Sequence, residues 1–347
     1  MIGSMRHPWF PDAEIDGSYG CDEAALRAVA PIDPPDGFAE RWRAWNLAAR
    51  RTPADPELEP IGRIGAHDVS ALAFGTADGL RIHGWLAVPS SGPARVGIVH
   101  SHGYGGREAP EFGRVPEDAA AVFPVARGLG AVNVGIGAPA ERDAHVVHGI
   151  ETDETYVLGR CASDLWSAAN VLDEVVGPLP HYLVGESFGG GIGALALPWD
   201  DRLMGATLIV PSFGQHAVRL GLRCEGSGEA LRRWVADHPE AREVLRTFDA
   251  STAALFARVP VRVEAALWDT VVPPPGQFAV AAGIAASGAD LELAVLPAGH
   301  AEYPGLPEVR AAAEAATLRH IAAALAHRRP DRDDAADEGL RRRGIRP

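Results

Sequence analysis

The stretch that decides the fold is His181-Tyr182-Leu183-Val184-Gly185-Glu186-Ser187-Phe188-Gly189-Gly190-Gly191. Its first part reads as the end of a short buried strand, and the glycine-rich run after Ser187 opens a helix that continues to about Leu197. Between them lies Gly-x-Ser-x-Gly, which on a strand-to-helix turn forms a nucleophile elbow. Gly185 and Gly189 let the strand and helix close around a strained serine. We expect the Ser187 hydroxyl at a helix N-terminus, where developing negative charge is favoured; the alternative is an ordinary serine in a glycine-rich turn.

The length, composition and net charge of the chain limit the classes of protein to which it can belong. The chain has 347 residues, of which 47% are hydrophobic and 22% charged, so it can bury a large core. Its formal net charge of −14 argues against nucleic acid or an anionic membrane as a partner. The sequence therefore predicts a globular protein that binds neither nucleic acid nor membrane.

The three cysteines, Cys21, Cys161 and Cys224, show no metal or redox spacing and suit a reducing compartment. Residues 1–17 contain no apolar run of signal-peptide length, and no segment approaches the length of a membrane span. These observations together predict a soluble cytoplasmic protein.

The sequence of the first 88 residues predicts an N-terminal extension followed by a β-hairpin. Residues 1–60 are rich in proline and aspartate, and Phe38, Trp42 and Trp45 share one helical face that we expect to pack on the main body. Strand patterns at residues 69–74 and 80–88 predict a half-exposed antiparallel hairpin.

From residue 96 onward, strand and helix patterns alternate. This order predicts an α/β fold with a mostly parallel sheet covered by helices on both faces. We expect one domain over residues 61–327, with a small helical insertion at 212–257 and a charged, disordered tail at 328–347. The expected strands are residues 96–100, 131–134, 206–210, 261–267 and 291–296; the expected helices include residues 118–129, 277–286 and 307–326.

A serine hydroxyl needs a base to become a good nucleophile, and in this topology the order along the chain is serine, acid, histidine. Asp269 follows the strand at residues 261–267 and precedes a proline turn, so it is the candidate acid; it could instead only cap the next helix. His300 lies in the loop after the last strand and is the candidate base, with a surface role as the alternative.

An oxyanion hole needs two backbone N–H groups that point to the place where negative charge develops. Phe188, directly after the nucleophile, supplies one, and Tyr104 in the glycine-rich loop at residues 102–106 is the candidate for the other. Trp85, Phe213 and Trp268 could line the substrate pocket, although core packing explains aromatic residues equally well.

Several of these motifs, taken together, are similar to those of a known family. From about residue 38 to residue 325 the chain resembles the acetyl xylan esterase / cephalosporin C deacetylase family of α/β-hydrolases. The shared motifs are Gly84-Trp85-Leu86, the Gly-Tyr-Gly-Gly-Arg loop at 103–107, the elbow, Arg-Thr-Phe-Asp at 246–249 and Trp-Asp-Thr-Val-Val-Pro-Pro at 268–274.

The resemblance implies an α/β-hydrolase fold that hydrolyses acetyl esters of sugars and cephalosporins, commonly as a hexamer. It places the family's triad on Ser187, Asp269 and His300, and its oxyanion donors on Tyr104 and Phe188.

Three positions depart from the family pattern. Phe188 replaces the usual glutamine after the nucleophile, and Ala301 replaces the glutamate after the histidine, with Glu302 one residue later. Residues 134–137 read Val-Gly-Ile-Gly where the family has Arg-Gly-Gln-Gly. We expect a more apolar entrance and altered specificity for the acyl group and the alcohol.

Candidate metal and phosphate motifs in the chain lack the spacing that such sites require. His100 with His102, or His145 with His148 and Glu151, could face one side, but neither set has zinc-site spacing. The glycines at 103–106 are not followed by the Gly-Lys-Ser/Thr of a phosphate loop. The sequence therefore predicts no metal and no cofactor.

The leading hypothesis is a serine carboxylesterase that deacetylates a small-molecule, sugar or natural-product ester through an acyl-enzyme. One alternative keeps the triad in an acyltransferase or an acetate-eliminating biosynthetic enzyme. Another is a hydrolase-fold binding protein without turnover. The predicted partner is a small-molecule ester, with a homo-oligomer possible.

Overall fold

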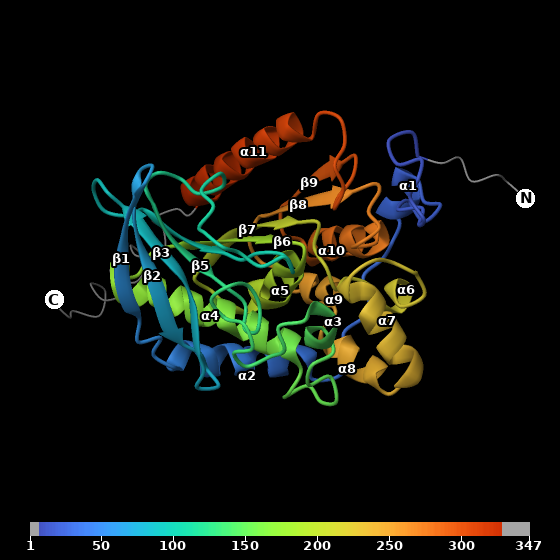
Figure 1. Ribbon diagram of the computed structural model, residues 1–347, viewed down its shortest axis with the longest axis horizontal. Coiled ribbons are helices and arrows are strands. Elements are labelled where there is room, and N and C mark those ends of the chain that lie inside the picture. The colour runs from blue at the N-terminus through green and yellow to red at the C-terminus, as the bar shows by residue number, and fades with distance from the viewer. Residues whose placement is uncertain (1–6, 328–347) are drawn as a thin grey trace, which may run out of the picture.

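A computed structural model describes residues 7–327, which form one continuous sheet with helices on both sides (Figure 1). The predicted tail at 328–347 lies outside the described residues. The sheet order is β1-β2-β3-β5-β4-β6-β7-β8-β9. The strands of this sheet are β1 Glu57–Ile64, β2 His67–Gly75, β3 Arg81–Pro89, β4 Val96–His100, β5 Ala119–Pro124, β6 His181–Glu186, β7 Leu203–Ile209, β8 Val261–Ala266 and β9 Leu291–Leu296.

The sheet is antiparallel at one edge and parallel over the rest. β1, β2 and β3 form a meander, and β3 pairs antiparallel with β5. From β5 through β4 and β6 to β9 every pairing is parallel. The carboxyl ends of the parallel strands therefore meet at one edge, where such sheets place their binding sites.

Helices cover both faces. α4 and α5 pack against β4–β7 and α10 packs against β8 and β9, while α2 lies outside α4; α11 packs against β7 from the opposite side (Figure 1). The helices are α1 Glu23–Arg27, α2 Phe38–Arg51, α3 Arg142–His145, α4 Val157–Val176, α5 Phe188–Ala196, a 3₁₀ turn Leu197–Trp199, α6 His216–Arg219, α7 Ser227–Asp237, α8 Ala241–Thr247, α9 Ala250–Ala254, α10 Pro274–Ser287 and α11 Leu306–His327.

Two elements expected from the sequence are wrong. The helix expected at 118–129 is strand β5, which is buried along its whole length between β3 and β4. Its alanines suggested a helix, but small side chains also fit a strand that is covered on both faces. The strand expected at 131–134 is reduced to a single bridge between Gly128 and Val134.

The N-terminal region is more closely joined to the sheet than the sequence indicated. β1 crosses the expected boundary at residue 60, so part of the extension belongs to the sheet. Helix α2 buries Phe38 and Trp42, and the Trp42 indole N–H donates to the carbonyl of Thr247, 3.1 Å away. Residues 212–257 contain α6 to α9 and, in the part of the chain that the structure describes, no strand. Across residues 7–327 the longest apolar helices fall short of what a bilayer crossing requires.

Candidate active site

The nucleophile elbow is a strained turn at the carboxyl end of β6. Ser187 directly precedes α5 with φ 54° and ψ −112°, a conformation that a side chain rarely adopts. Its N–H donates to the carbonyl of Ile209 (2.8 Å), and its carbonyl accepts from the N–H of Ser212 (3.0 Å). These bonds from the neighbouring strand and its loop hold the turn in place.

The two motif glycines are required by close approach. A Cβ on Gly185 would lie 2.3 Å from the carbonyl oxygen of Gly189. A Cβ on Gly189 would lie 2.7 Å from the carbonyl oxygen of His102, in the loop after β4. Neither position can accept a side chain, so the strand, the helix and the glycine-rich loop close tightly around Ser187.

The structure brings Ser187, His300 and Asp269 into one hydrogen-bonded chain. Nε2 of His300 lies 2.8 Å from Oγ of Ser187, and Nδ1 lies 2.8 Å from Oδ2 of Asp269. An ionised carboxylate can only accept, so Nδ1 carries the proton and Nε2 is left as the acceptor for the serine hydroxyl. This is the arrangement in which a neutral imidazole can take the proton of a nucleophile.

Asp269 is fully buried and every side of its carboxylate is occupied. Oδ1 accepts the N–H groups of Val271 (2.9 Å) and Val272 (3.0 Å). Oδ2 accepts from the side-chain amide of Gln277 (3.0 Å) as well as from His300. The proline turn after the strand thus bonds the acid in addition to leading into α10.

Burial would by itself lower the pKa of His300, but the hydrogen bond to Asp269 and its negative charge, with a smaller contribution from Glu186, raise that pKa above its ordinary value. Gly299 is what permits the contact, because a Cβ there would lie 2.0 Å from Oδ2 of Asp269. An imidazolium formed by transfer of the Ser187 proton would therefore be stabilised.

The proposed oxyanion donors lie on either side of the serine. The N–H of Phe188 is the first of α5, and the N–H of Tyr104 lies in the loop after β4; neither has an acceptor within residues 7–327. A Cβ on Gly103, next to Tyr104, would lie 3.5 Å from the Cβ of Ser187, so this loop flanks the nucleophile.

Two polar side chains brace that loop. His102 lies beneath it: Nδ1 donates to the carbonyl of Gly103 (2.7 Å) and Nε2 accepts the N–H of Ala126 (2.9 Å). Burial lowers the pKa of His102 to about 4, so it stays neutral in this role. The buried guanidinium of Arg107 donates to the carbonyls of His100 and Ser101.

A pocket of about 390 Å³ opens beside the serine. Its wall includes the loop at residues 102–106, called here the oxyanion loop, together with Ser187, His300, Ser212, Ser227 and the pair Val271–Val272. The Ser187 hydroxyl and the loop that carries Tyr104 thus border one space, which has room for an acyl group.

Comparison with known proteins shows the family of the chain. The family model described as acetyl xylan esterase (AXE1) matches residues 27–308. The chain belongs to the acetyl xylan esterase family. It is a serine hydrolase that acts on carboxylic ester bonds, and the family seen in the sequence motifs is confirmed.

Solved structures show the same fold. The acetyl xylan esterase 1 from Thermoanaerobacterium sp. JW/SL YS485 matches with a TM-score of 0.73 at 18% identity, covering 86% of this chain and 98% of that one. The acetyl xylan esterase from Paenibacillus sp. R4 matches with a TM-score of 0.71 at 18% identity, over 85% and 99% of the two chains. An acylaminoacyl peptidase from Pyrococcus horikoshii reaches 0.59 at 16% identity, over 76% and 42%. The predicted α/β-hydrolase fold is confirmed.

In this esterase the aromatic residues expected to line the pocket are packed elsewhere. Trp85 lies in the core on β3, Phe213 is fully buried against Gly191, and Trp268 stacks on Phe10 with ring centroids 3.9 Å apart. None of the three borders the pocket beside Ser187. The expectation of an aromatic lining is wrong because each ring fills a gap in the packing.

The ring of Phe188 also turns inward. It is fully buried and packs on Tyr104, with centroids 4.4 Å apart. The more apolar entrance expected from Phe188 is therefore not provided by its side chain, since the ring supports the oxyanion loop from below.

Two of the histidines considered as metal ligands, His102 and His145, are engaged in other contacts. Nε2 of His145 lies 3.0 Å from the carbonyl of Arg127, and Nδ1 lies 3.3 Å from the Tyr104 hydroxyl. In residues 7–327, no group of three or more histidine, cysteine, aspartate or glutamate side chains is arranged to hold a metal ion.

Sequence reasoning missed the contribution of the N-terminal segment. The N–H of Asp269 donates to the carbonyl of Gly17 (2.9 Å), and a Cβ on Gly17 would lie 2.6 Å from the Trp268 ring. Trp9 stacks on Tyr303 beyond His300. No motif marks Gly17, and Gln277 likewise carried no signal beyond its place in α10.

Proposed function

We propose that this esterase removes small acyl groups, acetyl above all, from a small-molecule, sugar or natural-product ester, with Ser187, His300 and Asp269 as its triad. The observation that supports this most is the unbroken chain of two 2.8 Å contacts from Oγ of Ser187 through the imidazole to Asp269. Family membership and the structural similarity to two acetyl xylan esterases favour acetyl as the acyl group.

In this mechanism Ser187 attacks the ester carbonyl while Nε2 of His300 takes its proton. The N–H groups of Phe188 and Tyr104 donate to the oxyanion of the tetrahedral intermediate. His300 returns the proton to the leaving alcohol, and Asp269 stabilises the imidazolium without being protonated itself. Water then enters, is deprotonated by His300 and releases the acid from the acyl-enzyme.

The alternatives of acyl transfer and acetate elimination are motivated by Phe188 and by the arginine missing at residues 134–137, which together suggest a drier site. Because the Phe188 ring packs inward, the first of these two reasons is removed, and hydrolysis is the better supported outcome. A cytoplasmic location, the absence of nucleic-acid binding and a homo-oligomer stay predictions of the sequence.

Hydrolysis of p-nitrophenyl acetate by the full chain tests the proposal. A serine-directed phosphonate should stop turnover and label Ser187, as peptide mass spectrometry would show. Dialysis against EDTA should leave the rate unchanged. A rate that collapses with EDTA and returns with zinc, or a label on another serine, would contradict the assignment.

A further inference from the structure

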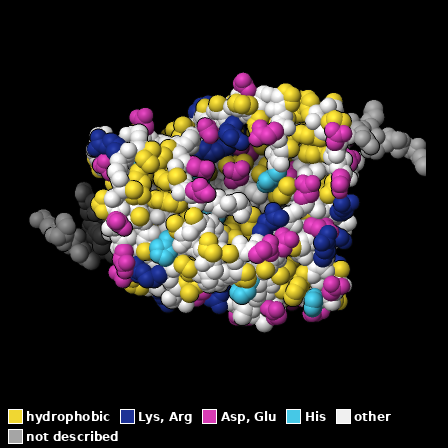
Figure 2. Space-filling view, viewed as in Figure 1, with side chains coloured by type: hydrophobic (Ala, Val, Ile, Leu, Met, Phe, Trp, Pro, Cys, Tyr) yellow, Lys and Arg dark blue, Asp and Glu magenta, His cyan; other side chains and the backbone are white. Residues whose placement is uncertain are grey.

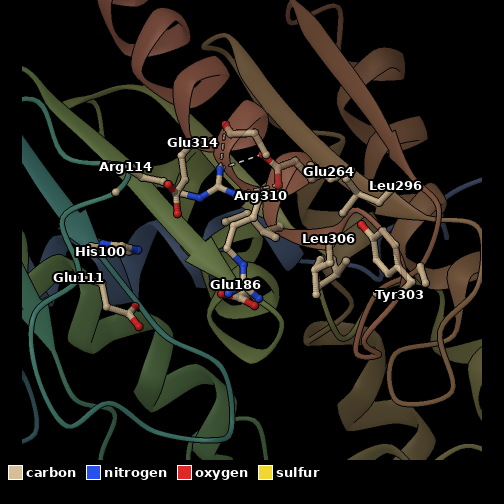
Figure 3. Close-up of a pocket in the computed structure, with 17 residues that line it drawn as sticks. His100, Glu111, Arg114, Glu186, Glu264, Leu296, Tyr303, Leu306, Arg310 and Glu314 are labelled. Carbon is tan, nitrogen blue, oxygen red and sulfur yellow. Dashed lines mark hydrogen bonds and ion pairs between the residues drawn. The ribbon is translucent and has the colours of Figure 1, made fainter.

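A second cavity, of about 480 Å³, adjoins the catalytic pocket (Figure 3). It lies between α11 and the carboxyl ends of β4, β6 and β7, and its rim includes the loop that carries His300. Two residues, Glu111 and Glu186, border both this cavity and the pocket beside Ser187. The two spaces are therefore neighbours that meet next to the nucleophile.

The second cavity is rich in carboxylates. Four glutamates border it against two arginines, so negative charge is in excess. Glu264 is neutralised by Arg114 through two contacts of 2.8 and 3.0 Å, which Figure 3 shows as dashed lines. Figure 2 shows a hollow on this face rimmed mainly by acidic side chains. The glutamates that remain are Glu111, Glu186 and Glu314, opposed by Arg310.

Glu186 is the carboxylate closest in sequence to the reacting centre. It is exposed at the end of β6, directly before Ser187, and within residues 7–327 its carboxylate makes no hydrogen bond or ion pair. Glu111 differs, because it lies 3.4 Å from the buried guanidinium of Arg107. Arg310 and Glu314 lie one turn apart on α11, and neither forms an ion pair with a described side chain. Of the two glutamates that border both spaces, Glu186 is therefore the one without an ion-pair partner within residues 7–327.

A buried polar group without a partner also borders the cavity. His100 is 7% exposed, its ring lies between Arg114 and Glu111 in Figure 3, and its Nδ1 has no hydrogen-bond partner among the described residues. Burial, with the charges of Arg107 and Arg114, holds the pKa of His100 well below its ordinary value. The imidazole is therefore neutral and adds no charge to the wall of the cavity.

We propose that the second cavity binds the alcohol part of the substrate, and that Glu186 selects an alcohol that carries a positively charged amine or quaternary ammonium group. This rests on the proposed function, in which the acyl group occupies the pocket beside the oxyanion donors. The alcohol then leaves past His300, whose neighbours Ala298 and Gly299 border the second cavity. Tyr303 lies on the same wall, with one face of its ring stacked on Trp9.

Two acetate esters of the same shape test this: acetylcholine and its uncharged isostere 3,3-dimethylbutyl acetate. The wild type should prefer acetylcholine in kcat/KM by about tenfold at low ionic strength, since a charge pair near a protein surface is worth that much or more. The preference should shrink as salt is added. In Glu186→Gln the ratio should fall close to one. Taking a ratio at one pH cancels the effect of Glu186 on His300, which is common to both esters.

Glu308→Gln is the matched control, because Glu308 is an exposed glutamate at the start of α11 that does not border the cavity. It should keep the wild-type ratio. Equal rates for the two esters in the wild type, or a preference that survives in Glu186→Gln, would overturn the inference while p-nitrophenyl acetate turnover leaves the proposed function standing. Absence of p-nitrophenyl acetate turnover would overturn the proposed function, and the inference with it.

Discussion

The two cavities that meet at Glu186 are built differently. In the catalytic pocket each member of the candidate triad is held by other groups: Asp269 accepts three hydrogen bonds besides that of His300. In the second cavity Glu186 has no partner in the described chain, and Nδ1 of His100 has none either. Groups that react must be preorganised, whereas groups that recognise one alcohol or another can be left for solvent or substrate to satisfy.

The largest effect is expected from a substitution in the catalytic pocket, where the reacting groups are held in place. Ser187→Ala removes the nucleophile and should lower kcat for p-nitrophenyl acetate by roughly four to six powers of ten, with the fold retained. Single-turnover kinetics would measure the loss of rate, and circular dichroism would show whether the fold is retained. Ser227→Ala, which removes another hydroxyl bordering the same pocket, is the control and should stay within about threefold of the wild type. Substantial activity in Ser187→Ala would show that Ser187 is not the nucleophile.

A smaller loss should follow when the support of Asp269 is disturbed from the N-terminal segment. A methyl group at Gly17 cannot fit against Trp268, so Gly17→Ala should displace the carbonyl that accepts the Asp269 N–H. We expect kcat to fall by about 10- to 100-fold with KM little changed, because misplacement of the triad affects the transition state more than binding.

The exposed residue Asp12, in the same segment, supplies the control variant Asp12→Ala. A purely structural role for Gly17 would lower the melting temperature and leave the kcat of the folded fraction, titrated with phosphonate, unaltered. That result would remove the N-terminal segment from the supports of the triad.

The sequence predicted what depends on local chemistry. The elbow, the acid after its strand and the histidine after the last strand are each set by a few neighbouring residues, and the structure brings Ser187, Asp269 and His300 together. The aromatic side chains could not be placed this way. Whether Trp85, Phe213 or Trp268 borders a pocket or fills the core is decided by segments far away in the chain, such as Phe10 on Trp268.

Contacts with distant segments also decide the structure of strand β5. Its run Ala119-Ala120-Ala121 has a high intrinsic helix propensity, and only its position between β3 and β4 makes it a strand. Glu186 was visible inside the elbow motif, but its place between two cavities depends on α11, more than 100 residues later. Tertiary context decided each feature that the sequence did not reveal.

The pH dependence of kcat/KM links the two cavities, because Glu186 borders both of them and its charge acts on the pKa of His300. His300 must be neutral to act as base, so kcat/KM should fall tenfold per pH unit below its pKa. That pKa is raised by Asp269 and Glu186, so the acid limb should lie above the ordinary histidine value of about 6.5. Glu186→Gln should move the limb to lower pH, whereas Glu308→Gln should not. A limb at or below the ordinary value would contradict the electrostatic account of the site.

The smallest expected effect concerns the size of the acyl pocket. Gly103 flanks Ser187, and the N–H of Ser212 is bonded to the serine carbonyl, so the walls stand close to the reacting carbon. In a series of p-nitrophenyl esters from acetate to octanoate, kcat/KM should therefore fall with each added methylene. An open pocket would instead gain about 0.8 kcal/mol per methylene, roughly a fourfold rise. Val271→Ala removes two methyl groups from the wall and should shift the preference toward butyrate. If the wild-type rate rises with chain length, the small-acyl proposal fails while the triad stands. If the alanine variant leaves the profile unchanged, the acyl chain does not run along the Val271–Val272 wall.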